Sequence, residues 1–278
     1  MNWIVIALIV WAAAFAVNLW LVRRGGRAAA YLVPVIFGLT ILFIWEGMVR
    51  GLNISPVLLP PPSAIGAALI SKTHILWTDL VQTFFKGALT GYVIGCGSAI
   101  VTALLIDRSS FLQRGLLPVG NFIAALPIVG LAPIMVMWFG FDWQSKAAVV
   151  VAMVFFPMLV NTVQGLQAST AMQRDLMRTY AAGYGQTLRF LRLPAAMPFI
   201  FNGLKISTTL ALIGAIVAEF FGSPIKGMGF RISTEVGRLA LDMVWAEITV
   251  AAILGSAFYG LMALLEKRMT FWHPSQRG

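Results

Sequence analysis

Charged residues are scarce in this chain of 278 residues: they make up 11% of it, whereas soluble domains carry about 25%. Cys96 is the only cysteine, so a disulfide within the chain and a cysteine-based metal site are both excluded. With only His74 and His273 as histidines, the composition also argues against a metal cluster. These shortages exclude a soluble globule and argue against a metal cluster.

Two kinds of chemical motif are also missing. No Gly-x-x-x-x-Gly-Lys-Ser/Thr loop occurs, so the chain lacks the backbone nest that binds ATP phosphates, and any ATPase must be another polypeptide. Glu219 and Glu247 have no His, Lys or Cys close in sequence that would define a nucleophile or an acid and base pair. We therefore expect no catalytic site in this chain.

What the chain has in abundance is apolar sequence, since 59% of it is hydrophobic. A helix that crosses about 30 Å of hydrocarbon needs roughly 17 to 25 apolar residues. The pattern predicts an all-α polytopic membrane protein with about six or seven spans, of which the fourth is interrupted by prolines. The candidate spans are about Trp3–Leu21, Tyr31–Met48, Lys86–Ile106, Leu117–Trp138, Ala147–Val163, Ile206–Phe221 and Trp245–Leu265.

The first span has no positive charge ahead of it, as a cleaved signal peptide would require. Its positive charges follow it instead, at Arg23, Arg24 and Arg27. The positive-inside rule then places the N-terminus outside, and the remaining lysines and arginines place the C-terminus in the cytoplasm. We expect a retained anchor rather than a removed signal.

A polar, basic segment, Asp175–Pro194, lies between two strongly apolar stretches. It has helix-forming content, arginines and a Leu-Pro end, which we interpret as a helix stop. The charge distribution places this segment in the cytoplasm. An amphipathic helix lying on anionic lipid and a docking surface for a partner both fit this composition.

The spacing in this segment resembles the coupling motif of bacterial ABC importer permeases, which reads Glu-Ala-Ala, three residues, Gly, nine residues, Ile, one residue, Leu-Pro. Asp175 stands for the Glu, Leu176 and Met177 for the alanines, Ala181 for the Gly and Leu191 for the Ile, while Leu193 and Pro194 match outright. The replaced alanines and glycine are departures from the motif.

Other stretches resemble the permease branch that imports nitrate, taurine and aliphatic sulfonates, including relatives for pyrimidine thiamine precursors or riboflavin. They are Trp138-Phe139-Gly140, Ser145-Lys146, Phe155-Phe156-Pro157 and Asn161-Thr162, in this order. The resemblance covers residues 31–273. It implies an N-terminal anchor and basic loop at 1–30, a permease domain of the type I importer fold at 31–273 with a coupling segment at 166–198, and a cytoplasmic tail at 274–278.

The resemblance implies a non-enzymatic permease subunit of the bacterial inner membrane. Two copies of it would work with two ATPase subunits, which bind ATP and Mg, and with a periplasmic or lipoprotein solute receptor. The coupling residues implied are Asp175, Met177, Arg178, Tyr180, Ala181, Ala182, Tyr184, Leu191, Leu193 and Pro194. We expect Arg192 and the neighbouring arginines to meet acids or lipid phosphates.

For the translocation path, the resemblance and the apolar setting suggest Asn161, Thr208 and Glu219. An acid within a membrane span suggests a functional role, because burying its charge costs free energy. Glu219 could equally hydrogen-bond a neighbouring helix. For Glu46 and Glu247 we favour a structural role. An ion-coupled secondary transporter is the alternative function, although no internal repeat is evident.

Two local patterns predict packing. Gly87, Gly91 and Gly95 form a small-xxx-small series, which we assign to helix packing within the subunit rather than to a dimer seam. Ser63 follows a run of prolines and is placed as the N-cap of a short helix. As for the solute, we favour a small aromatic N-heterocycle over a sulfonate.

Overall fold

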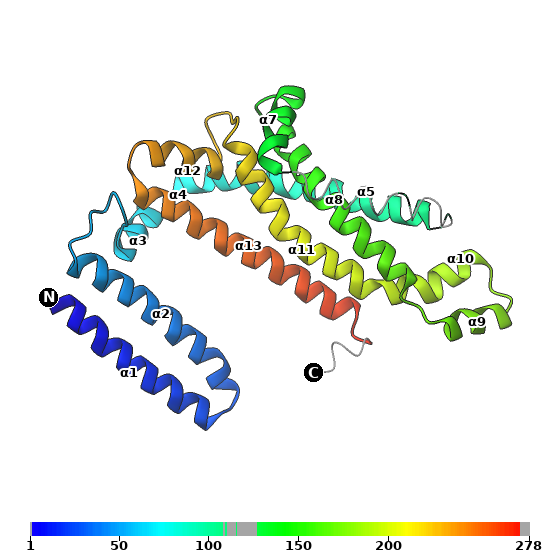
Figure 1. Ribbon diagram of the computed structural model, residues 1–278, viewed down its shortest axis with the longest axis horizontal. Helices are drawn as coiled ribbons and strands as arrows, with labels where there is room; N and C mark the ends of the chain where they lie inside the picture. The colour runs from blue at the N-terminus through cyan, green and yellow to red at the C-terminus, as the bar shows by residue number, and fades with distance from the viewer. Residues whose placement is uncertain (1, 108, 110–114, 116–126, 273–278) are drawn as a thin grey trace. The chain divides into compact units, whose positions relative to one another are not determined.

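The computed structural model describes residues 2–107, 109, 115 and 127–272. These residues are arranged as helices and connecting turns (Figure 1). In chain order the helices are α1 (Asn2–Arg24), α2 (Arg27–Gly51), α3 (Pro62–Ser71), α4 (Thr73–Leu80), the π-helix η1 (Val81–Leu89), α5 (Thr90–Ile106), α7 (Ile128–Phe139), α8 (Trp143–Gln167), α9 (Ala171–Thr179), α10 (Tyr184–Thr187), the π-helix η2 (Leu188–Arg192), α11 (Leu193–Glu219), α12 (Met228–Gly237) and α13 (Leu241–Met269).

Six helical stretches in the described part of the chain are long and apolar enough to cross a membrane. They are Val5–Arg24, Ala28–Gly51, Thr73–Ile106, Trp143–Gln167, Tyr184–Glu219 and Leu241–Met269. The fourth predicted span, Leu117–Trp138, falls largely outside the described residues, and its described part belongs to α7, whose 12 residues are too few to cross the bilayer. The all-helical membrane fold is confirmed.

Two compact units make up the chain, and each is described by itself. The first consists of Met1–Leu76 and Ile232–Ile248 and contains the hairpin of α1 and α2 together with α3. The second consists of Trp77–Arg231 and Thr249–Gly278 and contains α5, α8 and α11. The predicted C-terminal tail at 274–278 lies outside the described residues.

In the first unit, Glu46 near the end of α2 stabilises the start of α3. Its carboxylate accepts hydrogen bonds from the Ser63 backbone N–H at 2.9 Å and from the Ser63 hydroxyl at 2.8 Å, and it pairs with Arg50. The prediction that Ser63 is the N-cap is therefore wrong: Pro61 occupies that position and Ser63 lies in the first turn. A carboxylate at the positive end of a helix is favourable, so the structural role predicted for Glu46 is confirmed.

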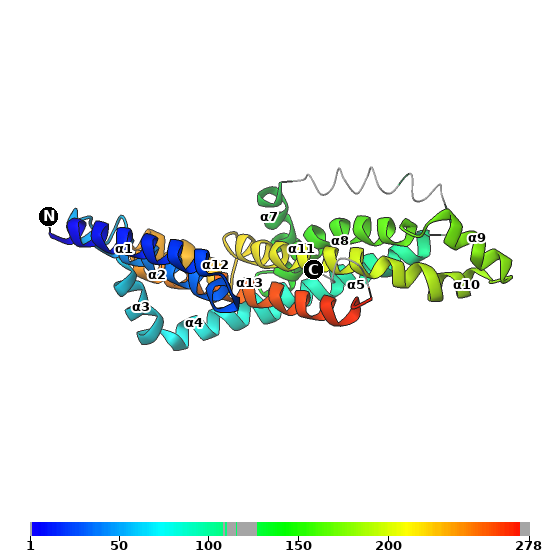
Figure 2. The same cartoon turned by 90° about the horizontal axis from the view of Figure 1, so that it is seen from below.

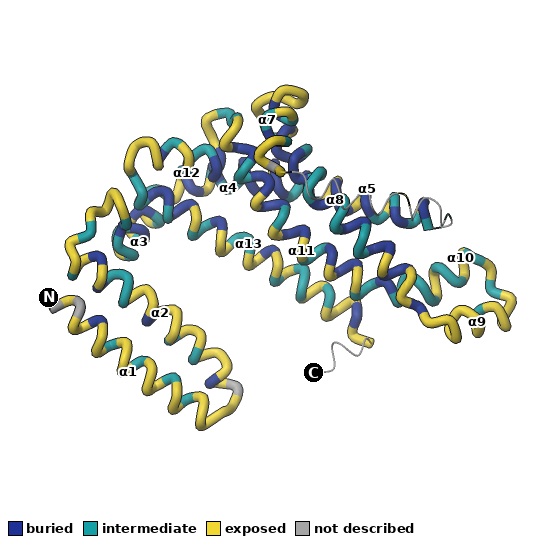
Figure 3. Tube along the Cα trace, viewed as in Figure 1, coloured by how far each residue is buried: buried dark blue, intermediate teal, exposed yellow. Residues whose placement is uncertain are grey.

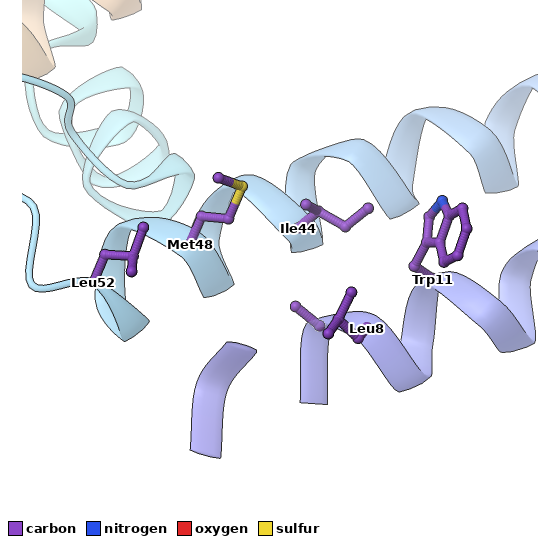
Figure 4. Close-up of a pocket in the computed structure, with 6 residues that line it drawn as sticks. Leu8, Trp11, Ile44, Met48 and Leu52 are labelled. Carbon is purple, nitrogen blue, oxygen red and sulfur yellow. The ribbon is translucent and has the colours of Figure 1, made fainter. Parts of the chain in front are cut away.

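An apolar pocket of about 400 Å³ lies between α1 and α2 (Figure 4). Its lining is Ala7, Leu8, Trp11, Ile44, Met48 and Leu52. Aliphatic side chains and one indole offer no set of convergent polar groups to orient a solute. We therefore do not place a solute path there.

In the second unit, α8 packs against both α5 and α11 and has buried residues along most of its length (Figure 3). A Cβ atom on Gly91 would lie 2.6 Å from Val150 Cβ, and one on Gly95 would lie 3.1 Å from Val151 Cα. Only glycine allows α5 to approach α8 this closely. The prediction that this glycine series packs helices within the subunit is confirmed.

Candidate functional site: an exposed helix and two buried polar clusters

The segment that resembles the coupling motif forms α9, α10 and η2. In both ribbon views α9 and α10 extend beyond the packed ends of α5 and α8 (Figures 1 and 2). A capping box begins α9: Thr170 Oγ1 accepts from the Gln173 N–H at 3.2 Å, and Gln173 Oε1 accepts from the Thr170 N–H at 2.9 Å. These bonds satisfy amides that helix geometry leaves unpaired. The helix therefore forms locally, and none of its residues is buried.

The end of α9 explains why the motif has glycine at the position of Ala181. Ala181 has φ = 51°, in the left-handed region that costs an L-residue roughly 1–2 kcal/mol. The Ala182 N–H donates to Met177 O at 3.0 Å, and the Ala181 N–H donates to Arg178 O at 2.8 Å. This is the Schellman arrangement, in which glycine usually occupies the left-handed position.

The polar residues of this helix and its end face solvent. Asp175 Oδ1 lies 3.2 Å from Arg178 Nη1, with side-chain exposures of 67% and 83%. Tyr180 is 76% exposed, and Ala181 is exposed too. Met177 and Ala182 are partly buried. An exposed ion pair of this kind adds little stability, so these side chains are free to meet another surface.

The second half of the segment turns back into the chain. Leu191, Leu193 and Pro194 are partly buried, and Leu193 packs against the main core. The interpretation of Leu-Pro as a helix stop is wrong, because Leu193 and Pro194 begin α11. The wider turn of η2 directly before it accommodates a proline ring that would collide with the preceding turn of a regular helix.

Two residues of this segment are held within the chain. Tyr184 Oη donates to Asp107 Oδ2 at 2.6 Å, and Arg192 Nη1 and Nη2 lie 2.6 Å from the two Asp107 oxygens. The expectation that Arg192 meets an acid is confirmed, and the acid is Asp107 of this chain. Nothing in the sequence pairs residues 107 and 192, which are 85 positions apart.

A second buried polar cluster surrounds Glu219, at the other end of α11. The Glu219 carboxylate accepts from the Thr83 hydroxyl at 2.9 Å and from the Gly229 N–H at 2.8 Å, and Thr83 Oγ1 accepts from the Met228 N–H at 2.7 Å. Gly227 has φ = 119°, and a Cβ there would collide with the carboxylate. The cluster fastens the chain after α11 to η1.

Asp79 extends this cluster. Its carboxylate accepts from the Gly227 N–H at 2.7 Å and pairs with Arg231 Nε at 2.8 Å, while its side chain is fully buried. Sequence reasoning missed both Asp79 and Thr83, and only the high cost of burying an acid would have drawn attention to Asp79. Among the described residues, no group of three or more His, Cys, Asp or Glu could hold a metal ion.

Asp142 precedes α8 and accepts the Trp143 N–H at 2.8 Å as the N-cap of that helix. The Gln82 amide donates to the same carboxylate at 3.1 Å. These two hydrogen bonds, the one from Gln82 first, lower the pKa of Asp142 because they stabilise its charged form.

The three residues suggested for the translocation path do not form one site. Asn161 accepts from Asn202 at 3.1 Å and donates to Pro157 O at 2.8 Å, whereas buried Thr208 donates to Lys205 O at 2.7 Å. Thr208 and Glu219 are both on α11, separated by about 16 Å of helix at the usual rise of 1.5 Å per residue.

A groove of about 480 Å³ runs between α11 and α13. Its polar lining consists of Thr209, Ser256 and Tyr259, and its other walls are small or aliphatic residues. A mainly apolar groove with a few hydroxyls suits a small organic solute. Thr209 is adjacent to the predicted Thr208, but Ser256 and Tyr259 had no signal in the sequence.

Taken together, these observations describe a helical, multi-pass membrane protein with one helix, α9, that buries none of its residues. Residues 91–271 match the family described as binding-protein-dependent transport system inner membrane component. The chain belongs to this family: it is the permease component of an ABC transporter, a non-catalytic, multi-pass subunit of the inner membrane that transports a small solute. The ion-coupled secondary transporter is thereby set aside.

Several relatives are similar over most of their length. The formylaminopyrimidine transport permease protein of Halalkalibacterium halodurans is 31% identical over 90% of this chain and 99% of that protein. The riboflavin transport system permease protein of Chloroflexus aurantiacus is 26% identical over 87% and 90%, respectively. The taurine transport system permease protein of Escherichia coli is 26% identical over 84% and 86%.

Proposed function

We propose that α9 and the turn that follows it dock this permease onto its ATPase subunit. The observation that carries this proposal is that α9 is capped at both ends yet buries none of its residues, whereas α8, the long helix before it, has many buried residues. Exposed Asp175, Arg178, Tyr180 and Ala181 would form the contact, with Met177 and Ala182 at its edge.

In this proposal the ATPase binds ATP and Mg, and the docking segment lies in the cytoplasm. The N-terminus of α1 then lies outside, since Arg23 and Arg24 follow that helix. Two copies of the permease would enclose the path, with the groove between α11 and α13 as part of its wall. Nucleotide binding would shift the spans between inward-open and outward-open states by favouring one of them.

The solute that we propose is a small aromatic N-heterocycle, such as a pyrimidine or a flavin, rather than taurine or another sulfonate. The similarity to the formylaminopyrimidine permease over nearly its whole length supports this choice. The lining of the α11–α13 groove also supports it, because it offers hydroxyls and apolar surface. A sulfonate would instead favour cationic or amide donors.

Docking is tested by replacing Ala181 with arginine and measuring co-purification of the ATPase with the membrane-inserted permease. Leu239→Arg is the matched control, since Leu239 is also exposed and has φ = 62° but lies far along the chain from α9. We expect Ala181→Arg to lose the ATPase and Leu239→Arg to keep it. Unchanged co-purification by the Ala181 variant would contradict the docking assignment.

The solute is tested on the solute-binding protein that works with this permease. Its thermal stability is measured with pyrimidines, flavins, taurine and nitrate, since a ligand that binds only the folded receptor raises its melting temperature. A shift with a pyrimidine or flavin supports the proposal. A shift with taurine or nitrate alone would overturn it.

A further inference from the structure

Asp107, Tyr184 and Arg192 form a compact polar cluster, here called the Asp107 clamp. Both guanidinium nitrogens of Arg192 lie 2.6 Å from the Asp107 oxygens, in the two-pronged geometry that fixes the relative orientation of the two groups. The side chain of Asp107 is 1% exposed and that of Arg192 is 16% exposed. The pair is thus shielded from solvent, unlike the Asp175–Arg178 pair on α9.

The clamp joins four elements of the second unit. Asp107 directly follows α5, Arg192 closes η2 and Tyr184 begins α10. The Nε atom of Arg192 also donates to Leu166 O at 2.9 Å, in the last turn of α8. One guanidinium therefore connects the segment after α9 to the ends of two membrane helices.

The two helices held by the clamp are themselves packed closely. Gly91 and Gly95 bring α5 against α8 so tightly that an added Cβ would collide with Val150 or Val154. Close-packed elements move together rather than deform. A displacement applied at the clamp is therefore shared by α5 and α8.

We propose that the Asp107 clamp is the joint through which movement of the α9–α10 region reaches the membrane helices, with Asp107 and Arg192 as positioning residues for transport. This inference rests on the proposed docking of the ATPase at α9. The division of the segment supports it: α9 buries nothing and is available to the partner, whereas α10 and η2 are fastened to α5 and α8.

The test uses the permease assembled with its ATPase in lipid nanodiscs. A nitroxide is attached at exposed Gln144, in the first turn of α8 and at the opposite end of that helix from Leu166, in a Cys96→Ser background. The spectrum is compared without nucleotide and with ATP, Mg²⁺ and vanadate. We expect a nucleotide-dependent change in the parent protein and about a tenfold smaller change in Asp107→Asn, within the range of couplings between sites.

Glu266→Gln is the matched control, because the Lys205–Glu266 ion pair is also 2.6 Å long and mostly buried but lies outside the clamp. We expect this variant to keep the spectral change. Tyr184→Phe, which removes one of the bonds to Asp107, is expected to give an intermediate change. A full change in Asp107→Asn, or an equal loss in Glu266→Gln, would overturn the inference.

Asp107→Asn leaves Arg192 as an unpaired buried charge and could fail to assemble. The double variant Asp107→Leu with Arg192→Met removes both charges, and apolar replacement of a buried pair often preserves stability. We expect it to bind the ATPase without the spectral change, and a full spectral change would overturn the inference. Retention of the ATPase by Ala181→Arg would instead contradict the docking proposal, so the two failures are distinguishable.

Discussion

Replacing Ala181 with glycine is expected to stabilise the end of α9. The left-handed conformation at φ = 51° costs alanine roughly 1–2 kcal/mol, and glycine adopts it freely. Glycine also has more conformational freedom than alanine in the unfolded segment, and this favours unfolding by about 0.5–1 kcal/mol. The net stabilisation is roughly 0.5–1 kcal/mol, equivalent to a two- to fivefold change in the local opening equilibrium.

Hydrogen exchange measures this effect directly, because the Ala181 and Ala182 amides close the turn by donating to Arg178 O and Met177 O. After correction for intrinsic rates, we expect both amides to exchange about two- to fivefold more slowly in Ala181→Gly. Ala182→Gly is the matched control, because Ala182 is not among the residues with positive φ. It should exchange faster, since glycine there adds freedom without relieving strain.

Unchanged or faster exchange at these amides in Ala181→Gly would refute the reasoning. It would mean that the alanine at this position is not strained, and that the Schellman turn does not account for the glycine of the motif.

Three further outcomes follow from the packing. Gly95→Val should destabilise the second unit by at least about 2 kcal/mol, because its side chain would collide with Val154; thermal unfolding in detergent measures this. Glu46→Ala should increase hydrogen exchange at the Ser63 amide by roughly three- to tenfold, since the carboxylate no longer caps α3. Asp142→Ala should lower the free energy of unfolding by about 0.5–2 kcal/mol, because it removes the N-cap of α8. The pKa of Asp142 is lower in the folded protein than in the unfolded chain. Its contribution to stability is therefore present at pH values above the unfolded-state pKa and is lost as the pH falls through the folded-state pKa. The melting temperatures of the wild type and of Asp142→Ala should converge on acidification. Unaltered exchange at Ser63, or melting temperatures that do not converge, would contradict the respective structural roles.

The membrane fold was predictable because bilayer burial leaves a strong signal in composition. Scarce charge and long apolar runs indicate spans wherever the helices cross, and Gly91 and Gly95 indicate close packing through their spacing alone. The fourth predicted span was the least regular, and only the short α7 represents it in the described part of the chain.

The polar clusters were not predictable, because each depends on residues far apart in sequence. Arg192 reaches Asp107 across 85 positions, and Thr83 reaches Glu219 across 136. Sequence periodicity describes one helix at a time and contains no such pairing. The helix end at Pro194 was misread for a related reason: the π-helix η2 accommodates the proline, and a single sequence does not reveal where a wider turn occurs.

Contact between α9 and the ATPase is the central claim, and photocrosslinking tests it most directly. A benzophenone amino acid is placed at Met172 on α9 or at Ile70 on α3, two side chains that are each 82% exposed. In membranes containing the assembled transporter, we predict that irradiation crosslinks the ATPase to the Met172 variant and not to the Ile70 variant. Crosslinking from Ile70, or none from Met172 in a complex that still contains the ATPase, would contradict the account.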